Sequence, residues 1–207
     1  MQTPKKGSKK LLNAWAFYDW ANSVYSLVIA SSVFPLYYQA LFSSAGIEYI
    51  SIFGGTIRST PLITYTTAIA FIFISLLIPI LSGIADFVGN KKVFMKFFCY
   101  LGAFSCMGLY FFNLENILTS LLFYFLALIG FWCSWIFYNS YLPDVAYPEQ
   151  QDKLSAKGFS LGYIGSVLLL LFNLAMIMFP ESFGLGDDGA SKMKAMQISF
   201  ISVGVWW

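Results

Sequence analysis

An acidic side chain lies inside the first long apolar segment of this chain. Between Leu11 and Phe42, Asp19 is the one charged residue. An aspartate at the centre of a membrane helix costs roughly 2.5–3.5 kcal/mol, so such a residue faces protein or water and marks a functional site by default. Asp19 is therefore our candidate for binding a proton or another cation on a pathway through a membrane.

Three polar residues follow Asp19 at helical spacing. Positions i, i+3, i+4 and i+7 share one face of a helix, and here they hold Asp19, Asn22, Ser23 and Ser26. A polar stripe on an apolar helix must face a cavity or a partner helix. One interpretation is functional: the stripe contacts a solute or relays protons. The other is structural: the stripe forms a hydrogen-bond network between helices.

A second polar and aromatic group, Trp135, Tyr138 and Asn139, lies near the end of the fourth apolar segment. Aromatic residues near helix ends often anchor a protein at the membrane interface. The group is therefore predicted to be either an interfacial anchor or part of a solute pathway.

The composition determines the class of protein. The 207 residues are 58% hydrophobic and only 11% charged, whereas soluble domains carry about 25% charged residues. The chain has no histidine, no nucleotide-binding loop and an odd number of cysteines without metal-ligand spacing. The lysines form no stripe that would bind nucleic acid. We expect an integral membrane protein in contact with the lipid bilayer, with no metal, no cofactor, no nucleic-acid partner and no enzymatic activity.

Apolar segments predict the membrane topology, because a spanning helix needs about 20 mostly apolar residues. A basic tail at 1–10 precedes five complete spans and a sixth, incomplete one. The spans are 11–42, 62–85, 93–113, 117–142, 158–179 and 195–207. The last is too short to cross a core of about 30 Å at 1.5 Å per residue, so we expect the sequence to be cut inside its sixth helix.

Basic residues predict the orientation, because cytoplasmic loops carry an excess of lysine and arginine. With the N-terminus inside, nine of the 12 basic residues lie inside and three lie outside. The inner ones are Lys5, Lys6, Lys9, Lys10, Lys91, Lys92, Lys96, Lys153 and Lys157, and the outer ones are Arg58, Lys192 and Lys194. The N-terminus is therefore predicted to be cytoplasmic.

The connection between the second and third spans reads SGIADFVGNKK. It resembles the signature loop of the major facilitator superfamily, which occupies this same place. The residues that carry or adjoin the match are Gly83, Ala85, Asp86, Gly89, Lys91 and Lys92. Phe87 and Asn90 stand where arginines are usual, so the resemblance does not extend to a gate built on those arginines. The alternative to a signature loop is a positively charged hairpin loop without a gating role.

The resemblance implies a gating role for this loop. Gly89 permits a turn with positive φ, and Asp86 can accept hydrogen bonds at a helix N-terminus. Asp144, after the fourth span, is predicted either to pair with Lys91 or Lys92 at the inner gate or to be a solvated loop carboxylate.

Small residues predict close helix packing in the fifth span. Gly158 and Gly162 are four residues apart and Gly165 follows, a spacing that lets helix backbones approach closely.

Four further segments, 13–23, 138–146, 155–165 and 200–207, resemble hallmarks of the "unknown major facilitator" group. That group is related to the fungal vacuolar amino-acid effluxers linked to autophagy. The resemblance implies an all-α, six-helix N-terminal bundle with a truncated sixth helix, which needs a C-terminal six-helix half absent from this chain. It implies a secondary active transporter of the bacterial inner membrane that moves a small polar metabolite, such as amino acids, by alternating access.

A second class of function stays open. A half-size pore or scaffold, assembled from several six-helix chains, would also explain the absence of a C-terminal half.

Overall fold

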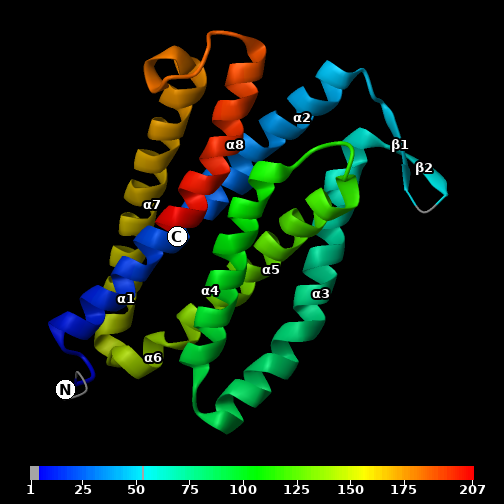
Figure 1. The fold of residues 1–207 in the computed structure, drawn as a ribbon. Coiled ribbons are helices and arrows are strands. Elements are labelled where there is room, and N and C mark those ends of the chain that lie inside the picture. The colour runs from blue at the N-terminus through cyan, green and yellow to red at the C-terminus, as the bar shows by residue number, and fades with distance from the viewer. Residues whose placement is uncertain (1–4, 53) are drawn as a thin grey trace.

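The computed structural model describes residues 5–52 and 54–207, apart from the side chains of Asp86 and Val88. The chain forms a bundle of long helices with a small β-hairpin at one end (Figure 1). Its helices are α1 (Lys9–Asn22), α2 (Phe34–Ala45), α3 (Ser59–Val88), α4 (Lys91–Gly108), α5 (Ile117–Ser140), α6 (Leu142–Val145), α7 (Pro148–Met178) and α8 (Gly189–Trp206).

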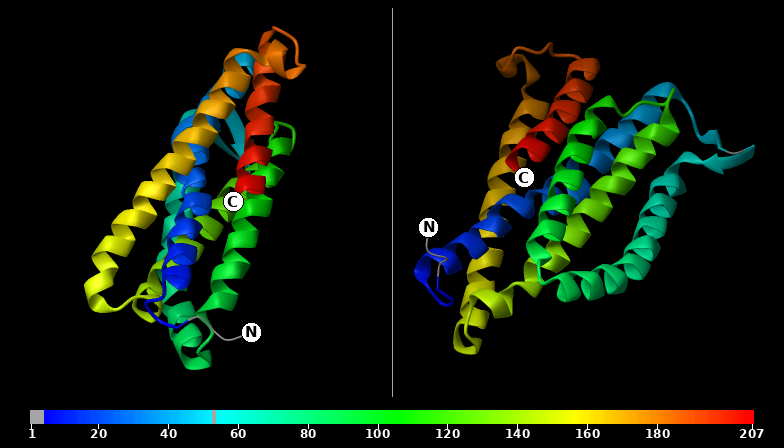
Figure 2. Two further views of the ribbon diagram at one scale, coloured as in Figure 1. Left: turned by 90° about the vertical axis from the view of Figure 1, so that its left-hand side faces the viewer. Right: turned by 60° about the horizontal axis from the view of Figure 1, so that its bottom comes forward.

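Five helical stretches of the described residues are long and apolar enough to cross a membrane. They are Lys9–Ala45, Ser59–Ala85, Lys91–Phe111, Ile117–Val145 and Pro148–Met178. Different views of the ribbon place α1 against α7, and α8 between α7 and α4 (Figure 2).

The first stretch is one helix with a wider middle. A π-helix at Tyr25–Val33 joins α1 to α2, and the N–H of Phe34 still donates to the carbonyl of Ile29, five residues earlier. Pro35 follows directly, and a proline inside a helix lacks a donor and collides with the carbonyl four residues before it. The π-helical turns let the chain continue through this region without a break.

The connection between the first two membrane-crossing stretches contains an antiparallel hairpin that the sequence did not predict. Strand β1 (Tyr49–Ile52) pairs with β2 (Gly55–Arg58), and Ile52 lies opposite Gly55 at the turn. The hairpin protrudes from the bundle beside the C-terminal end of α2 and the N-terminal end of α3 (Figure 1).

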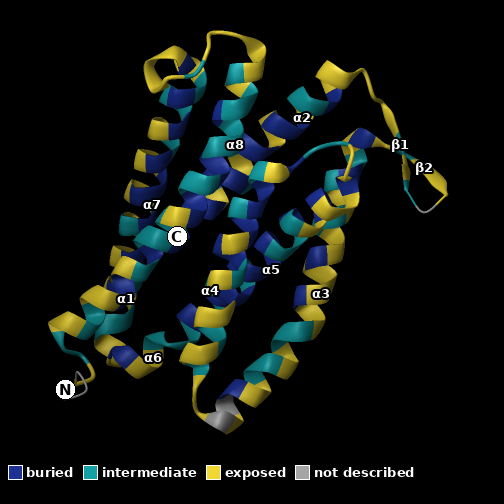
Figure 3. Cartoon of the chain, in the orientation of Figure 1, coloured by how far each residue is buried: buried dark blue, intermediate teal, exposed yellow. Residues whose placement is uncertain are grey.

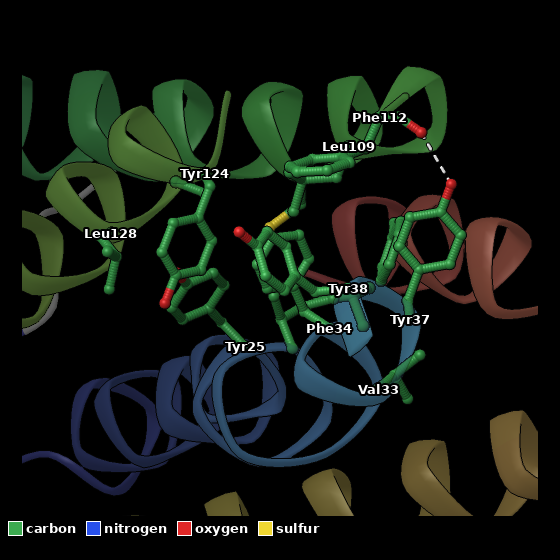
Figure 4. Close-up of a cluster of buried hydrophobic side chains, with 14 of the residues drawn as sticks. Tyr25, Val33, Phe34, Tyr37, Tyr38, Leu109, Phe112, Tyr124 and Leu128 are labelled. Carbon is green, nitrogen blue, oxygen red and sulfur yellow. Dashed lines mark hydrogen bonds between the residues drawn. The ribbon is translucent and has the colours of Figure 1, made fainter. Parts of the chain in front are cut away.

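The main core lies where α2 meets α5 and the end of α4, and it is rich in aromatic rings (Figure 4). Phe34 stacks on Tyr124 with ring centroids 4.5 Å apart and meets Phe112 edge-on. The hydroxyl of Tyr37 donates to the carbonyl of Phe112 at 2.7 Å. In lipid, each buried polar group needs an internal partner, and this bond supplies one for the tyrosine.

The outward faces of α3 and α7 are apolar and exposed (Figure 3). On α3, Ile69, Ile72 and Leu76 are each more than half exposed. A soluble protein would bury such a surface, whereas a membrane bundle presents it to lipid or to another group of helices.

Two helices begin earlier than the predicted membrane spans do. Helix α1 begins at Lys9, inside the predicted tail 1–10, and Gly7 just before it donates its N–H to the carbonyl of Val145. Helix α8 begins at Gly189 instead of residue 195. The predicted spans followed apolar runs, whereas a helix begins at its cap. For α8 this cap is Asp188, whose carboxylate accepts hydrogen bonds from Ser191 that lower its pKa.

Candidate solute-binding cleft

A cleft of about 260 Å³ lies on the face that the first helical stretch presents between α5 and α7. One side is polar, and the other two are mainly aromatic. The first stretch contributes Asp19, Ser23, Ser26, Leu27 and Ser31; α5 contributes Phe131, Trp132 and Trp135; α7 contributes Phe159, Tyr163 and Ser166. Ser26, Ser31, Phe159 and Tyr163 are exposed, so the cleft opens to the surface of this bundle.

Asp19 is the charged residue of the cleft. Its side chain is only 3% exposed, and its Oδ1 accepts a hydrogen bond from Ser23 Oγ at 2.8 Å. Among the described residues, no lysine or arginine forms an ion pair with it. A buried carboxylate without a counter-charge is unfavourable unless it takes up a proton or a cation. Positive charge beside Asp19 would therefore be favourable.

The predicted stripe divides into two parts in the structure. Asp19, Ser23 and Ser26 line the cleft, but Asn22 does not. Asn22 is fully buried, and its Oδ1 lies 3.4 Å from the donating Ser134 Oγ of α5. At about 100° per residue, Asn22 lies at the edge of the stripe nearest α5. Asn22 therefore contacts a neighbouring helix, whereas the other three residues line a cavity.

The group at the end of α5 is also divided. Trp135 lines the cleft, whereas Asn139 donates from Nδ2 to the carbonyl of Trp135 on its own helix at 2.9 Å. Tyr138 is buried behind Asp19, and its ring stacks on that of Trp15 at 4.2 Å between centroids. Within the described residues the Tyr138 hydroxyl has no hydrogen-bond partner. Tyr138 therefore lies inside the bundle, whereas Trp135 and Asn139 are partly exposed.

The three glycines of α7 bring that helix against α1. A Cβ on Gly162 would lie 2.6 Å from Ser23 Oγ, and one on Gly165 would lie 2.7 Å from the carbonyl oxygen of Trp20. A Cβ on Gly158 would lie 3.1 Å from the Tyr138 hydroxyl and 3.3 Å from Asp19 Oδ2. Close helix packing and the position of Asp19 thus depend on the same glycines.

The signature loop is a tight connection between α3 and α4. Gly89 ends α3 with φ +67°, and Asn90 precedes α4. Lys91 Nζ lies 4.0 Å from Asp144 Oδ2, and both side chains are partly exposed. Exposed ion pairs contribute about 0–1 kcal/mol, so this contact can open at little cost.

The remaining predicted gating residues of the loop are exposed or have side chains outside the described part of the structure. Gly83 lies on an exposed face of α3 with open space where a Cβ would be, and Lys92 is exposed. The side chain of Asp86 lies outside the described residues.

A larger cavity, of about 790 Å³, lies between α2, the hairpin and α3, and it includes Glu48 and Arg58. Both of these side chains are exposed, so they are already solvated. We favour the smaller cleft as the functional site because its carboxylate is buried without a counter-charge.

Sequence reasoning missed most of the aromatic walls, namely Phe131, Phe159 and Tyr163, as well as Ser31 and Ser166 in the cleft. Their helices were predicted, but which faces of α5 and α7 meet α1 depends on tertiary packing. The glycines of α7 carried a usable signal, because Phe159, Tyr163 and Ser166 each follow one of them directly.

Comparisons with known proteins agree with this description. A family model described as "Vacuole effluxer Atg22 like" matches residues 7–207. The uncharacterized MFS-type transporter YxiO of Bacillus subtilis (strain 168) is 37% identical over 195 residues. The match covers 94% of this chain but 43% of that relative, so the chain spans less than half of the relative's length.

No solved structure matches the chain significantly. The family match extends over nearly the whole chain and includes every element of the cleft. The chain therefore belongs to the vacuole effluxer Atg22-like family of MFS-type transporters.

Proposed function

We propose that this chain is the N-terminal half of a secondary active transporter that moves a small polar metabolite, with amino acids as the first candidates, by alternating access. The observation that carries the proposal is Asp19, a buried carboxylate without a counter-charge in an open cleft between membrane-crossing helices. Intramembrane carboxylates of this kind mark solute and ion pathways.

The geometry supports motion of whole helices during transport. Glycines let α7 approach α1 closely, and the ion pair of Lys91 with Asp144 ties the α3–α4 connection to α6 by a weak contact. In alternating access a central site opens to each side by rocking of helical units against each other. The cleft would then be one wall of the solute site, and the second half of the transporter would supply the other.

A half-size pore or scaffold is the less well supported alternative. The curated relative is more than twice as long as the matched region, which favours a protein with a second helical unit.

An uptake assay tests the transporter directly. We expect the protein at its full natural length, reconstituted in liposomes, to accumulate at least one amino acid or similar polar metabolite above its equilibrium level when an ion or pH gradient is imposed. Collapsing the gradient with an ionophore should abolish the accumulation. Leakage of many unrelated solutes, with no accumulation of any, would support the pore instead.

The orientation is part of the proposal. The start of α1, α6 and the α3–α4 connection lie at one end of the bundle, and the connection after α7 lies at the other (Figure 1). The excess of basic residues around the first set supports a cytoplasmic location for that end.

Single cysteines provide the measurement. In a background where Cys99, Cys106 and Cys133 are replaced by serine, Ser182→Cys should react with a membrane-impermeant thiol reagent from outside intact cells. Asn90→Cys should react only after permeabilisation. Both positions are exposed, so access to reagent depends on the side of the membrane. Labelling of Asn90→Cys in intact cells would reverse the orientation.

A further inference from the structure

We propose that the cleft binds the ammonium group of an organic cation, with Asp19 as its counter-charge and aromatic rings around it. This inference rests on the proposed transport function and names the chemistry of the solute group that this half recognises.

The charge balance of the cleft gives the first argument. Asp19 is its one acidic residue, and none of the described residues that line it is a lysine or an arginine. A buried carboxylate without a counter-charge attracts a cation and repels a carboxylate group. A zwitterionic solute would therefore place its ammonium end here and its carboxylate elsewhere.

The walls give the second argument, because they distinguish an organic cation from a metal ion. Trp132 and Trp135 of α5 lie with ring centroids 5.7 Å apart in an edge-to-face arrangement, and Phe159 and Tyr163 of α7 form the opposite wall. Aromatic faces attract ammonium groups and cover their hydrocarbon parts. A small metal ion needs several oxygen ligands instead, and the described Asp, Glu and Cys residues form no group that could hold a metal.

The hydroxyl groups give the third argument. Ser166 is 2% exposed, lines the cleft, and its Oγ has no hydrogen-bond partner among the described residues. A buried hydroxyl without a partner is unfavourable. An ammonium group that donates hydrogen bonds, or a hydroxyl on the same solute, would satisfy it.

Matched pairs of cations and neutral molecules of the same shape test the proposal. The probes are choline against 3,3-dimethyl-1-butanol, and propylammonium against 1-propanol. Binding to the protein at its full natural length in nanodiscs is measured by calorimetry, and heats from empty nanodiscs are subtracted. We expect at least one cation to bind about tenfold or more tightly than its neutral counterpart.

Variants show whether the cleft is the site. Asp19→Asn should weaken cation binding by at least about 30-fold, because one partner of a buried charge pair is lost. Trp135→Leu should weaken cation binding by about 2- to 30-fold with a smaller effect on the neutral molecules. Asp188→Asn is the matched control: it makes the same chemical change on the exposed loop, and asparagine also caps helices well.

Two results would overturn the proposal. One is equal binding of cations and neutral molecules. The other is cation binding that Asp19→Asn leaves unchanged. A protein that accumulates a solute in liposomes but fails these tests keeps the transporter function and would use Asp19 for a proton alone.

Discussion

Asp19→Asn is expected to abolish both concentrative uptake and solute exchange, while the protein still folds and inserts. Removing one partner of a buried charge pair costs about 2–5 kcal/mol, which reduces affinity at least about 30-fold. Folding should survive because asparagine still offers an oxygen to Ser23 Oγ, the donor at 2.8 Å. Insertion becomes easier once the charge is gone. Uptake and exchange in liposomes provide the measurement.

The pair of assays separates three roles of Asp19. Loss of both uptake and exchange indicates a solute contact. Loss of uptake with normal exchange indicates a coupling proton, because exchange needs only the conformational cycle. If Asp19 is only structural, the variant loses a contact between helices worth about 0.6 kcal/mol on average and at most ~1.7. Such a variant would still concentrate solute, at lower expression. Asp188→Asn should behave as wild type throughout.

The class of fold followed from composition and apolar runs, and the main candidate residue of the proposed site, Asp19, was singled out by its cost in a membrane. Asp19, Ser23 and Ser26 were predicted to share a face, and the structure places all three in one cleft. That prediction needed only helical spacing. Asn22 has the same spacing but contacts Ser134, because neighbouring helices meet the two edges of a stripe differently.

Features that depend on contacts between distant segments were not predicted. The hairpin of β1 and β2 is too short to give a clear alternation, and the π-helix depends on how the first stretch passes Pro35. A close approach between Gly102 of α4 and Gly130 of α5 also went unnoticed. Each of these glycines has a small residue four positions later, Cys106 and Ser134, which is the spacing that permits close helix contact.

Gly130→Ala is expected to destabilise the bundle, and to do so more strongly than a methyl group added at Gly158, Gly162 or Gly165. A Cβ at this position would collide with both the Cα and the backbone nitrogen of Gly102, and would lie 2.8 Å from the carbonyl oxygen of Phe98. Backbone atoms cannot rotate away as a side chain can, so α4 and α5 must separate. Overpacking of this kind costs about 1–3 kcal/mol, and the thermal unfolding midpoint in detergent should fall by several degrees.

Gly83→Ala is the matched control, because it adds the same methyl group to a helix position with nothing within 4 Å. Alanine is favoured over glycine inside helices by about 0.5–1 kcal/mol, so the midpoint of this variant should stay level or rise. Both variants are heated at one scan rate, since unfolding of membrane proteins is often irreversible. Shifts of the unfolding midpoint in opposite directions would exclude a general effect of replacing glycine. Equal midpoints for Gly130→Ala and wild type would mean that α4 and α5 do not meet at Gly102. The α5 wall of the cleft would then lack the support that fixes Trp132 and Trp135 beside Asp19.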